Sequence, residues 1–218
     1  GFLKKVRKLA TDKGIVLIFD ECTSGFRETF GGLHKKYGVN PDMAIFGKAL
    51  GNGYAITALI GRREIMEAAQ STFISSTFWT ERIGSVAALK TLEIMERDKS
   101  WETITNTGNN ISKSWLNLGN KYKLAVSVSG LPALTGFNIH SDDWLKYKTY
   151  ITQEMLKNNI LASNVIYVCT EHGTQEIDNY FQILDPIFKV IADCENGDLS
   201  VDSLLDGPVC HGGFTRLN

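Results

Sequence analysis

The sequence IVLIFDE at residues 15–21 decides the expected fold of this chain. Its first five residues form an unbroken apolar run, which is typical of a strand buried on both faces of a parallel sheet. The run ends abruptly in Asp20. A second short apolar run, MAIF at residues 43–46, leads through one glycine into Lys48. We therefore expect an α/β domain in which two strands of one sheet end in opposite charges.

These two strand ends carry complementary chemistry. Ligands of open α/β sheets bind at the carboxyl ends of the strands, so Asp20 and Lys48 are expected to point into one crevice. An acid and an amine at fixed positions suit pyridoxal 5'-phosphate (PLP), whose aldehyde forms a Schiff base with lysine and whose pyridine nitrogen pairs with aspartate. On spacing alone, the alternative is a surface lysine and a helix-capping aspartate.

A second alternative is an ATPase fragment. Residues 16–21 have the form of a Walker B strand, in which the aspartate orders Mg²⁺. However, the sequence has no GxxxxGK[ST] phosphate loop, because Gly47-Lys48-Ala49 lacks the earlier glycine and the following hydroxyl. Nucleotide binding is therefore the weaker interpretation.

Composition narrows the class of partner. The 218 residues are 43% hydrophobic and 22% charged with a net charge of −1, which indicates an ordinary globular chain and no basic face for nucleic acid or an anionic membrane. The basic start at residues 1–9 has no apolar core region, so we expect an amphipathic helix and no signal peptide. No pair among the four cysteines is CxxC, which favours free thiols, no metal site and a cytoplasmic location.

Two domains are expected, at residues 1–105 and 106–218. The first should contain both charged strand ends, and the second should be a small α+β domain. The apolar pattern predicts helices at residues 2–12, 63–70, 81–96, 105–121, 144–157 and 175–191, and strands at residues 15–19, 43–46, 55–60, 125–129, 134–139 and 164–169. The helix at 81–96 carries an apolar stripe formed by Ile83, Val86, Ala87, Leu89 and Ile94.

Three motifs together point to a family. They are FDECTSGFR at residues 19–27, YGVNPD at 37–42 and FGKALGNG at 46–53. In order, spacing and residue type they resemble the class III PLP-dependent aminotransferases, closest to the glutamate-1-semialdehyde 2,1-aminomutase branch. The resemblance implies part of a fold-type-I transferase, with a mainly parallel sheet and helices plus the small C-terminal domain. It also implies a homodimer that transfers an amino group from a small-molecule donor to a carbonyl acceptor.

The resemblance implies roles for four residues. Asp20 would hold the pyridine nitrogen, and Lys48 would be both the Schiff-base lysine and the catalytic acid–base. Cys22 stands where the family usually has a valine packed on the cofactor ring, and simple packing is favoured there over a reactive thiol. Thr77 would reach the cofactor phosphate of the neighbouring subunit. Its alternative role is an N-terminal cap near the helix of Glu81.

Other positions depart from the family pattern. Thr80-Glu81-Arg82 replaces the usual Gly-Asn-Pro. The glutamate that gates the substrate carboxylate in the aminomutases falls near Asn164, which weakens the aminomutase alternative. His172 is expected to be a structural or turn residue, and Glu21 to sit in a polar network beneath the site.

The largest departure is length, because family members carry roughly another half-chain before residue 1. We therefore expect a fragment, with residues 1–105 as the C-terminal half of the large domain and 106–218 as the small domain with a native tail at residues 210–214. The alternative function is then a catalytically incomplete half that serves only in packing or dimerisation.

Overall fold

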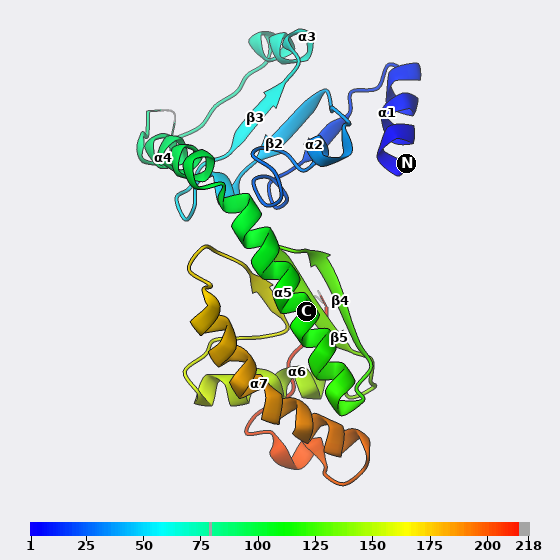
Figure 1. Cartoon of the computed structure of the whole chain (residues 1–218). Helices are drawn as coiled ribbons and strands as arrows, with labels where there is room; N and C mark the ends of the chain where they lie inside the picture. The colour runs from blue at the N-terminus through cyan, green and yellow to red at the C-terminus, as the bar shows by residue number, and fades with distance from the viewer. Residues whose placement is uncertain (79, 214–218) are drawn as a thin grey trace. The chain divides into compact units, whose positions relative to one another are not determined.

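The computed structural model describes residues 1–78 and 80–213. The chain forms two compact units, Gly1–Ile104 and Thr105–Asn218, and the described residues of each contain a three-stranded sheet (Figure 1). Phe214, the last residue of the tail expected at 210–214, lies outside the described residues, as does Trp79. In the part of the chain that is described, no helix is both long and apolar enough to cross a membrane.

The first unit is built on a mixed sheet of order β1-β2-β3. Strand β1 pairs parallel with β2, and β3 pairs antiparallel with β2. The predicted parallel pair is thus present, while the strand expected at 55–60 begins later and the helix expected at 63–70 divides into two short pieces. The elements of this unit are α1 (Phe2–Asp12), β1 (Ile18–Asp20), α2 (His34–Tyr37), β2 (Met43–Phe46), η1 (Lys48–Leu50), β3 (Ala58–Gly61), α3 (Arg63–Met66), η2 (Glu67–Ser71) and α4 (Ile83–Asp98).

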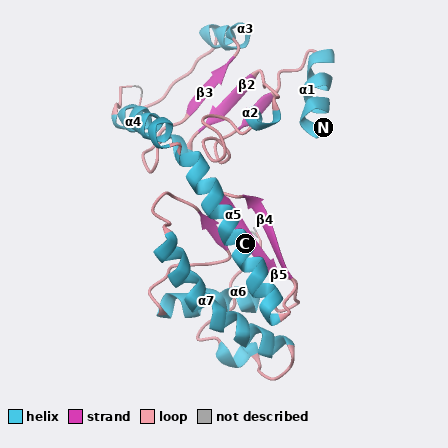
Figure 2. Cartoon of the chain, in the orientation of Figure 1, coloured by secondary structure: helices cyan, strands magenta, loops and turns pink. Residues whose placement is uncertain are grey.

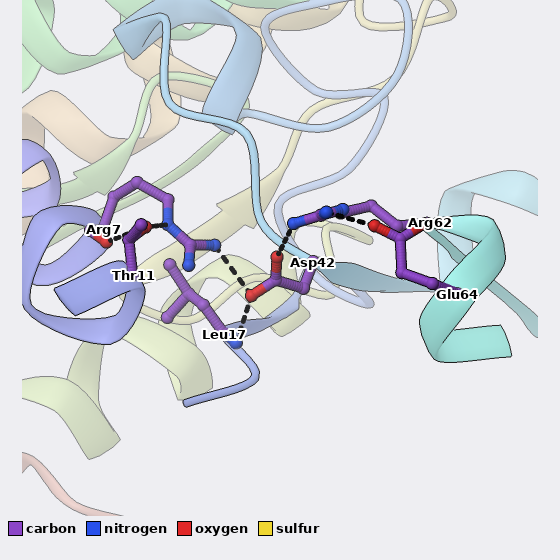
Figure 3. A network of polar contacts seen from close by, with 6 residues as sticks. All are labelled: Arg7, Thr11, Leu17, Asp42, Arg62 and Glu64. Carbon is purple, nitrogen blue, oxygen red and sulfur yellow. Dashed lines mark hydrogen bonds and ion pairs between the residues drawn. The ribbon is translucent and has the colours of Figure 1, made fainter. Parts of the chain in front are cut away.

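Asp42 joins three parts of this unit (Figure 3). Its carboxylate accepts the backbone N–H of Leu17 at 2.8 Å, Arg7 of α1 at 2.8 Å and Arg62 beyond β3 at 3.1 Å. The Asp42 side chain is buried. Because a buried charge is tolerated only when it is paired and hydrogen-bonded, these contacts tie α1 and the segments that flank the two outer strands, β1 and β3, to one carboxylate.

Strand β1 departs from the prediction of burial on both faces. The strand expected at residues 15–19 begins only at Ile18 and ends at Asp20. Ile15, which precedes it, is 57% exposed, and Ile18 is 50% exposed. Strand β1 also stands at the edge of the sheet formed by the described residues, with β2 as its partner. The apolar run does form a strand of a parallel pair, but the described chain does not cover both of its faces.

Helix α4 also packs differently from its sequence pattern. The stripe residues Ile83, Val86 and Leu89 are exposed, the last to 69%. The buried positions are instead Gly84 and Ala88. A Cβ at Gly84 would lie 2.5 Å from the carbonyl oxygen of Ala55, so small residues bring this face of the helix against the backbone.

The second unit has an antiparallel sheet of order β4-β5-β6, with α5 running alongside it (Figure 2). Ser112 of α5 and Thr135 of β5 are joined by a hydrogen bond of 2.7 Å. Its core is aromatic: Phe137 of β5 contacts Trp115 and Phe188. Trp115 Nε1 donates to the Tyr180 hydroxyl at 3.0 Å. The elements are α5 (Ser100–Tyr122), β4 (Val126–Leu131), β5 (Leu134–Ile139), α6 (Trp144–Lys157), β6 (Val165–Tyr167), α7 (Thr174–Glu195) and η3 (Val201–Leu204).

Candidate active site

Asp20 lies at the carboxyl end of β1, opposite Ile45 of β2. Its side chain is exposed, and Oδ1 accepts the backbone N–H of Cys22 at 3.0 Å. This hydrogen bond lowers the pKa of Asp20, and the nearby positive charge of Lys48 acts in the same direction. The carboxylate therefore stays ionised at neutral pH and presents a fixed negative charge at this edge of the sheet.

Lys48 follows β2 after a single residue, Gly47, at the same end of the sheet. Its side chain is exposed, and Nζ donates to Thr23 Oγ1 at 2.6 Å. The backbone at Lys48 has φ +44°. The structure thus brings the amine of Lys48 to the loop that carries Asp20, with Thr23 as the direct contact.

Cys22 packs beside the backbone that leads to Lys48. A Cβ placed at Gly47 would lie 3.5 Å from Cys22 Sγ and 3.5 Å from the methyl group of Thr57. Burial raises the pKa of the Cys22 thiol, and the adjacent Asp20 carboxylate raises it further. Since the thiolate is the nucleophilic form, this environment favours a packing role over a reactive one.

Glu21 follows Asp20 directly in the sequence and is buried. Its carboxylate accepts a hydrogen bond from the Ser24 hydroxyl and one from each backbone N–H of Leu33 and His34, the latter two at 3.0 Å. The ring Nδ1 of His34 also lies 3.0 Å from this carboxylate. Burial by itself raises the pKa of Glu21, but these hydrogen bonds outweigh it, so the pKa lies below its ordinary value. The expected polar network is present, and its role here is to fix the loop.

Thr77 is exposed in the segment between η2 and α4. It does not cap α4, because the carboxylate of Glu81 accepts the backbone N–H groups of Ile83 at 2.6 Å and Gly84 at 3.3 Å. The alternative interpretation of Thr77 as the cap is therefore wrong. A carboxylate at this position also satisfies the positive end of the helix dipole.

A hollow of about 360 Å³ lies beside the Thr77 segment, which contributes Ser76 and Phe78 to its lining. Thr57 also lines this hollow, and its methyl group lies against Gly47. The hollow is lined by Ala55, Ile56, Thr57, Ser76, Phe78, Glu81, Gly84 and Ser85.

Asn164 and His172 both make structural contacts in the second unit. The Asn164 side-chain amide donates to the Phe137 backbone carbonyl at 3.0 Å, and the Asn164 backbone carbonyl accepts the Phe137 N–H at 2.9 Å. His172 Nδ1 accepts the backbone N–H of Cys169 at 3.3 Å, which is the turn role that we expected. Across the described residues, no group of three or more His, Cys, Asp or Glu side chains is arranged to hold a metal ion.

Two contacts near the site were not predicted from the sequence. Thr23 contacts Lys48, and His34 contacts Glu21. A hydroxyl three residues after Asp20 was a usable signal for Thr23. Nothing in the local sequence pattern indicated that His34 would contact Glu21 in the folded chain.

Comparison with solved structures identifies the fold as that of the PLP-dependent transaminases. The FumI protein of a Sphingopyxis species, in its PLP internal aldimine form, superposes with a TM-score of 0.82 at 23% identity over 89% of this chain and 48% of that one. An omega-transaminase from Sphaerobacter thermophilus gives a TM-score of 0.76 at 21% identity over 86% of this chain and 47% of that one. The predicted fold-type-I class is confirmed.

The sequence comparison identifies the family. Residues 1–179 match the model of Aminotransferase class-III, and the chain belongs to this family. It is 36% identical to 3-aminobutyryl-CoA aminotransferase of Cloacimonas acidaminovorans, over 81% of this chain and 44% of that protein. It is 28% identical to glutamate-1-semialdehyde 2,1-aminomutase of Ignicoccus hospitalis, over 88% of this chain and 49% of that protein. The chain spans about half the length of these curated relatives.

Proposed function

We propose that this chain supplies the lysine and the aspartate with which a class III aminotransferase binds pyridoxal 5'-phosphate. The observation that carries the proposal is the position of Asp20 and Lys48 at the same end of two paired parallel strands, in a chain whose first 179 residues match this family. Thr23, bonded to Lys48, and Cys22, bonded to Asp20, connect the two.

The chemistry of these residues fits the cofactor. Lys48 presents an exposed primary amine that can bind an aldehyde covalently, and Asp20 presents a carboxylate that can hold a protonated ring nitrogen. When bound, the cofactor supplies a ring that accepts electrons from the substrate carbon. The part of this chain is to keep that ring nitrogen charged through Asp20, to pack Cys22 beside it, and to move a proton at Lys48 Nζ.

We assign the substrates only by class, as an amino donor and a carbonyl acceptor. Transfer between two molecules is supported by the relative with the higher identity of the two, which is named as an aminotransferase. Intramolecular exchange is the second candidate, supported by the 28% identical aminomutase. Asn164 bears on this choice, because its amide is bonded to the Phe137 backbone and offers no carboxylate there.

We also propose that residues 1–105 are part of a large cofactor-binding domain, residues 106–218 form a small domain, and the working assembly is a homodimer. In that assembly, Thr77 would donate its hydroxyl to the cofactor phosphate of the partner subunit. Its exposure supports this role. A cytoplasmic location stays a prediction.

Covalent trapping tests the proposed function. The chain is incubated with pyridoxal 5'-phosphate, reduced with borohydride and digested, and the modified lysines are located by mass spectrometry. We expect the label to concentrate on Lys48 and to disappear from that peptide in Lys48→Arg, while Lys90 of α4, 60% exposed, gives the background. A label distributed over the exposed lysines, with no preference for Lys48, would contradict the proposal.

The packing-only alternative makes a different prediction. A chain that serves solely as a dimerisation half would self-associate in analytical ultracentrifugation and show no preferred lysine in the trapping experiment. Nucleotide binding in the presence of Mg²⁺, together with no reaction at Lys48, would instead support the ATPase interpretation.

A further inference from the structure

We propose that Thr23 is a positioning residue for Lys48, whose hydroxyl holds the lysine amine whenever that amine is not bound to the cofactor. This inference rests on the proposed function of Lys48. The juxtaposition behind it is a hydrogen bond of 2.6 Å from Lys48 Nζ to Thr23 Oγ1, between residues 25 positions apart. Hydrogen bonds in which one partner is charged are among the shorter and stronger ones in proteins.

Thr23 is fixed by its neighbours in the loop after β1. On one side, the N–H of Cys22 donates to Asp20 at 3.0 Å. On the other side, the N–H of Gly25 donates to the Glu21 carbonyl at 2.8 Å, and Ser24 Oγ donates to the buried Glu21 carboxylate. The Thr23 hydroxyl therefore projects from backbone that is tied to the end of β1 both before and after it.

The backbone of Lys48 is held from its own side. The N–H of Leu50 donates to the Gly47 carbonyl at 3.0 Å, and the N–H of Gly51 donates to the Lys48 carbonyl at 3.1 Å. Ala49 and Leu50 are buried, which anchors the turn that follows the lysine. What this anchoring leaves free is the four-carbon side chain, which carries much rotamer entropy. Thr23 is the residue that holds its far end.

The expected consequence is control over where the amine rests. A lysine that must bind an aldehyde and later move a proton needs its Nζ at a defined position. Reaction is faster when the reacting group already occupies that position before the substrate arrives. The Thr23 hydroxyl supplies such a position close to the Asp20 carboxylate, on the same loop. Valine has the shape of threonine without the hydroxyl, and serine has the hydroxyl without the methyl group. These two substitutions therefore separate the hydrogen bond from the packing.

The test uses the cofactor-free chain and a lysine-acetylating reagent at fixed pH. The rate of acetylation at Lys48 is measured by mass spectrometry relative to Lys90 in the same molecule. In Thr23→Val we expect the relative rate at Lys48 to rise about fivefold, because the amine is released from its acceptor. In Thr23→Ser we expect it to stay within about twofold of the original chain, because the acceptor is kept. An unchanged rate in Thr23→Val would overturn the proposal.

A second readout separates this inference from the proposed function. Cofactor trapping at Lys48 in the unaltered chain tests the function, whereas acetylation needs no cofactor. Trapping at Lys48 with equal acetylation in all variants would support the function and refute the role of Thr23. Faster acetylation in Thr23→Val without any trapping at Lys48 would support the contact and refute the function, and with it the proposed role. Circular dichroism checks that each variant is folded, and Thr23→Ala replaces Thr23→Val if the valine variant is not.

Discussion

Glu21 Oε1 lies 3.0 Å from two atoms of His34, the backbone nitrogen and the ring Nδ1. A single buried oxygen at the end of β1 thus fixes the residue at which α2 begins. The chain between these two residues carries Cys22 and Thr23. The stability of that loop is therefore expected to depend on a carboxylate that does not itself reach the exposed site.

Glu21→Ala is expected to lower the free energy of unfolding by roughly 2–4 kcal/mol, because it leaves the half-buried N–H groups of Leu33 and His34 without their acceptor. Urea denaturation followed by circular dichroism measures the change. Glu93→Ala is the matched control, since Glu93 is 61% exposed and pairs with Lys90 on the surface of α4. Its effect should stay below about 0.5 kcal/mol. Equal losses in the two variants would contradict the structural role of Glu21.

Asp42 is expected to make stability depend on pH in the acid range. The backbone N–H of Leu17 and the guanidinium groups of Arg7 and Arg62 lower the pKa of Asp42 from 3.8 to about 2. A lowered pKa means that the stabilisation is present above the ordinary value and is lost as the pH falls from 3.8 towards 2. At neutral pH it amounts to roughly 2 kcal/mol.

The comparison of the original chain with Asp42→Asn isolates this contribution. The asparagine variant should be less stable at pH 7, and the difference in unfolding free energy should shrink towards pH 2, where Asp42 is itself protonated. Asp12→Asn, which removes an exposed partner of Lys8, is the control and should show little difference at any pH. A difference for Asp42→Asn that does not change with pH would contradict this account.

Gly108→Ala is expected to destabilise the second unit although alanine is the better helix former. A Cβ at Gly108 would lie 1.8 Å from the Pro132 carbonyl oxygen, which belongs to the backbone and cannot rotate away. Helix propensity favours alanine by about 1 kcal/mol, whereas overpacking is expected to cost about 3 kcal/mol or more. Asn109→Ala, one residue further along α5 and exposed, should be neutral or stabilising in thermal unfolding. A rise in melting temperature for Gly108→Ala would show that α5 can move away from Pro132 at little cost.

The strand ends could be predicted because their signal is local. An apolar run that stops at a charged residue marks where a strand leaves the sheet, and parallel pairing places both such ends on one edge. Asp20 and Lys48 therefore came from the sequence alone. Thr23 and His34 did not, because their contacts depend on the path of residues 22–34, which hydrophobic periodicity does not encode.

Helix α4 shows a second limit of sequence patterns. Periodicity identifies an apolar face, but it does not say what covers that face. The inner face of α4 was decided instead by Gly84, which allows the helix to approach the Ala55 carbonyl. Likewise, Glu81 and not Thr77 caps α4, because the Glu81 carboxylate lies within hydrogen-bond distance of the N–H groups of Ile83 and Gly84.

Lys48, the residue that we propose binds the cofactor, has a backbone conformation that suits its side chain poorly. Its φ of +44° lies in a region that glycine visits freely and that costs other residues on the order of 1 kcal/mol. A chain selected only for stability would be expected to carry glycine at this position. Under the proposed function, the lysine at this position marks a point at which the fold gives up stability to keep an amine for the cofactor.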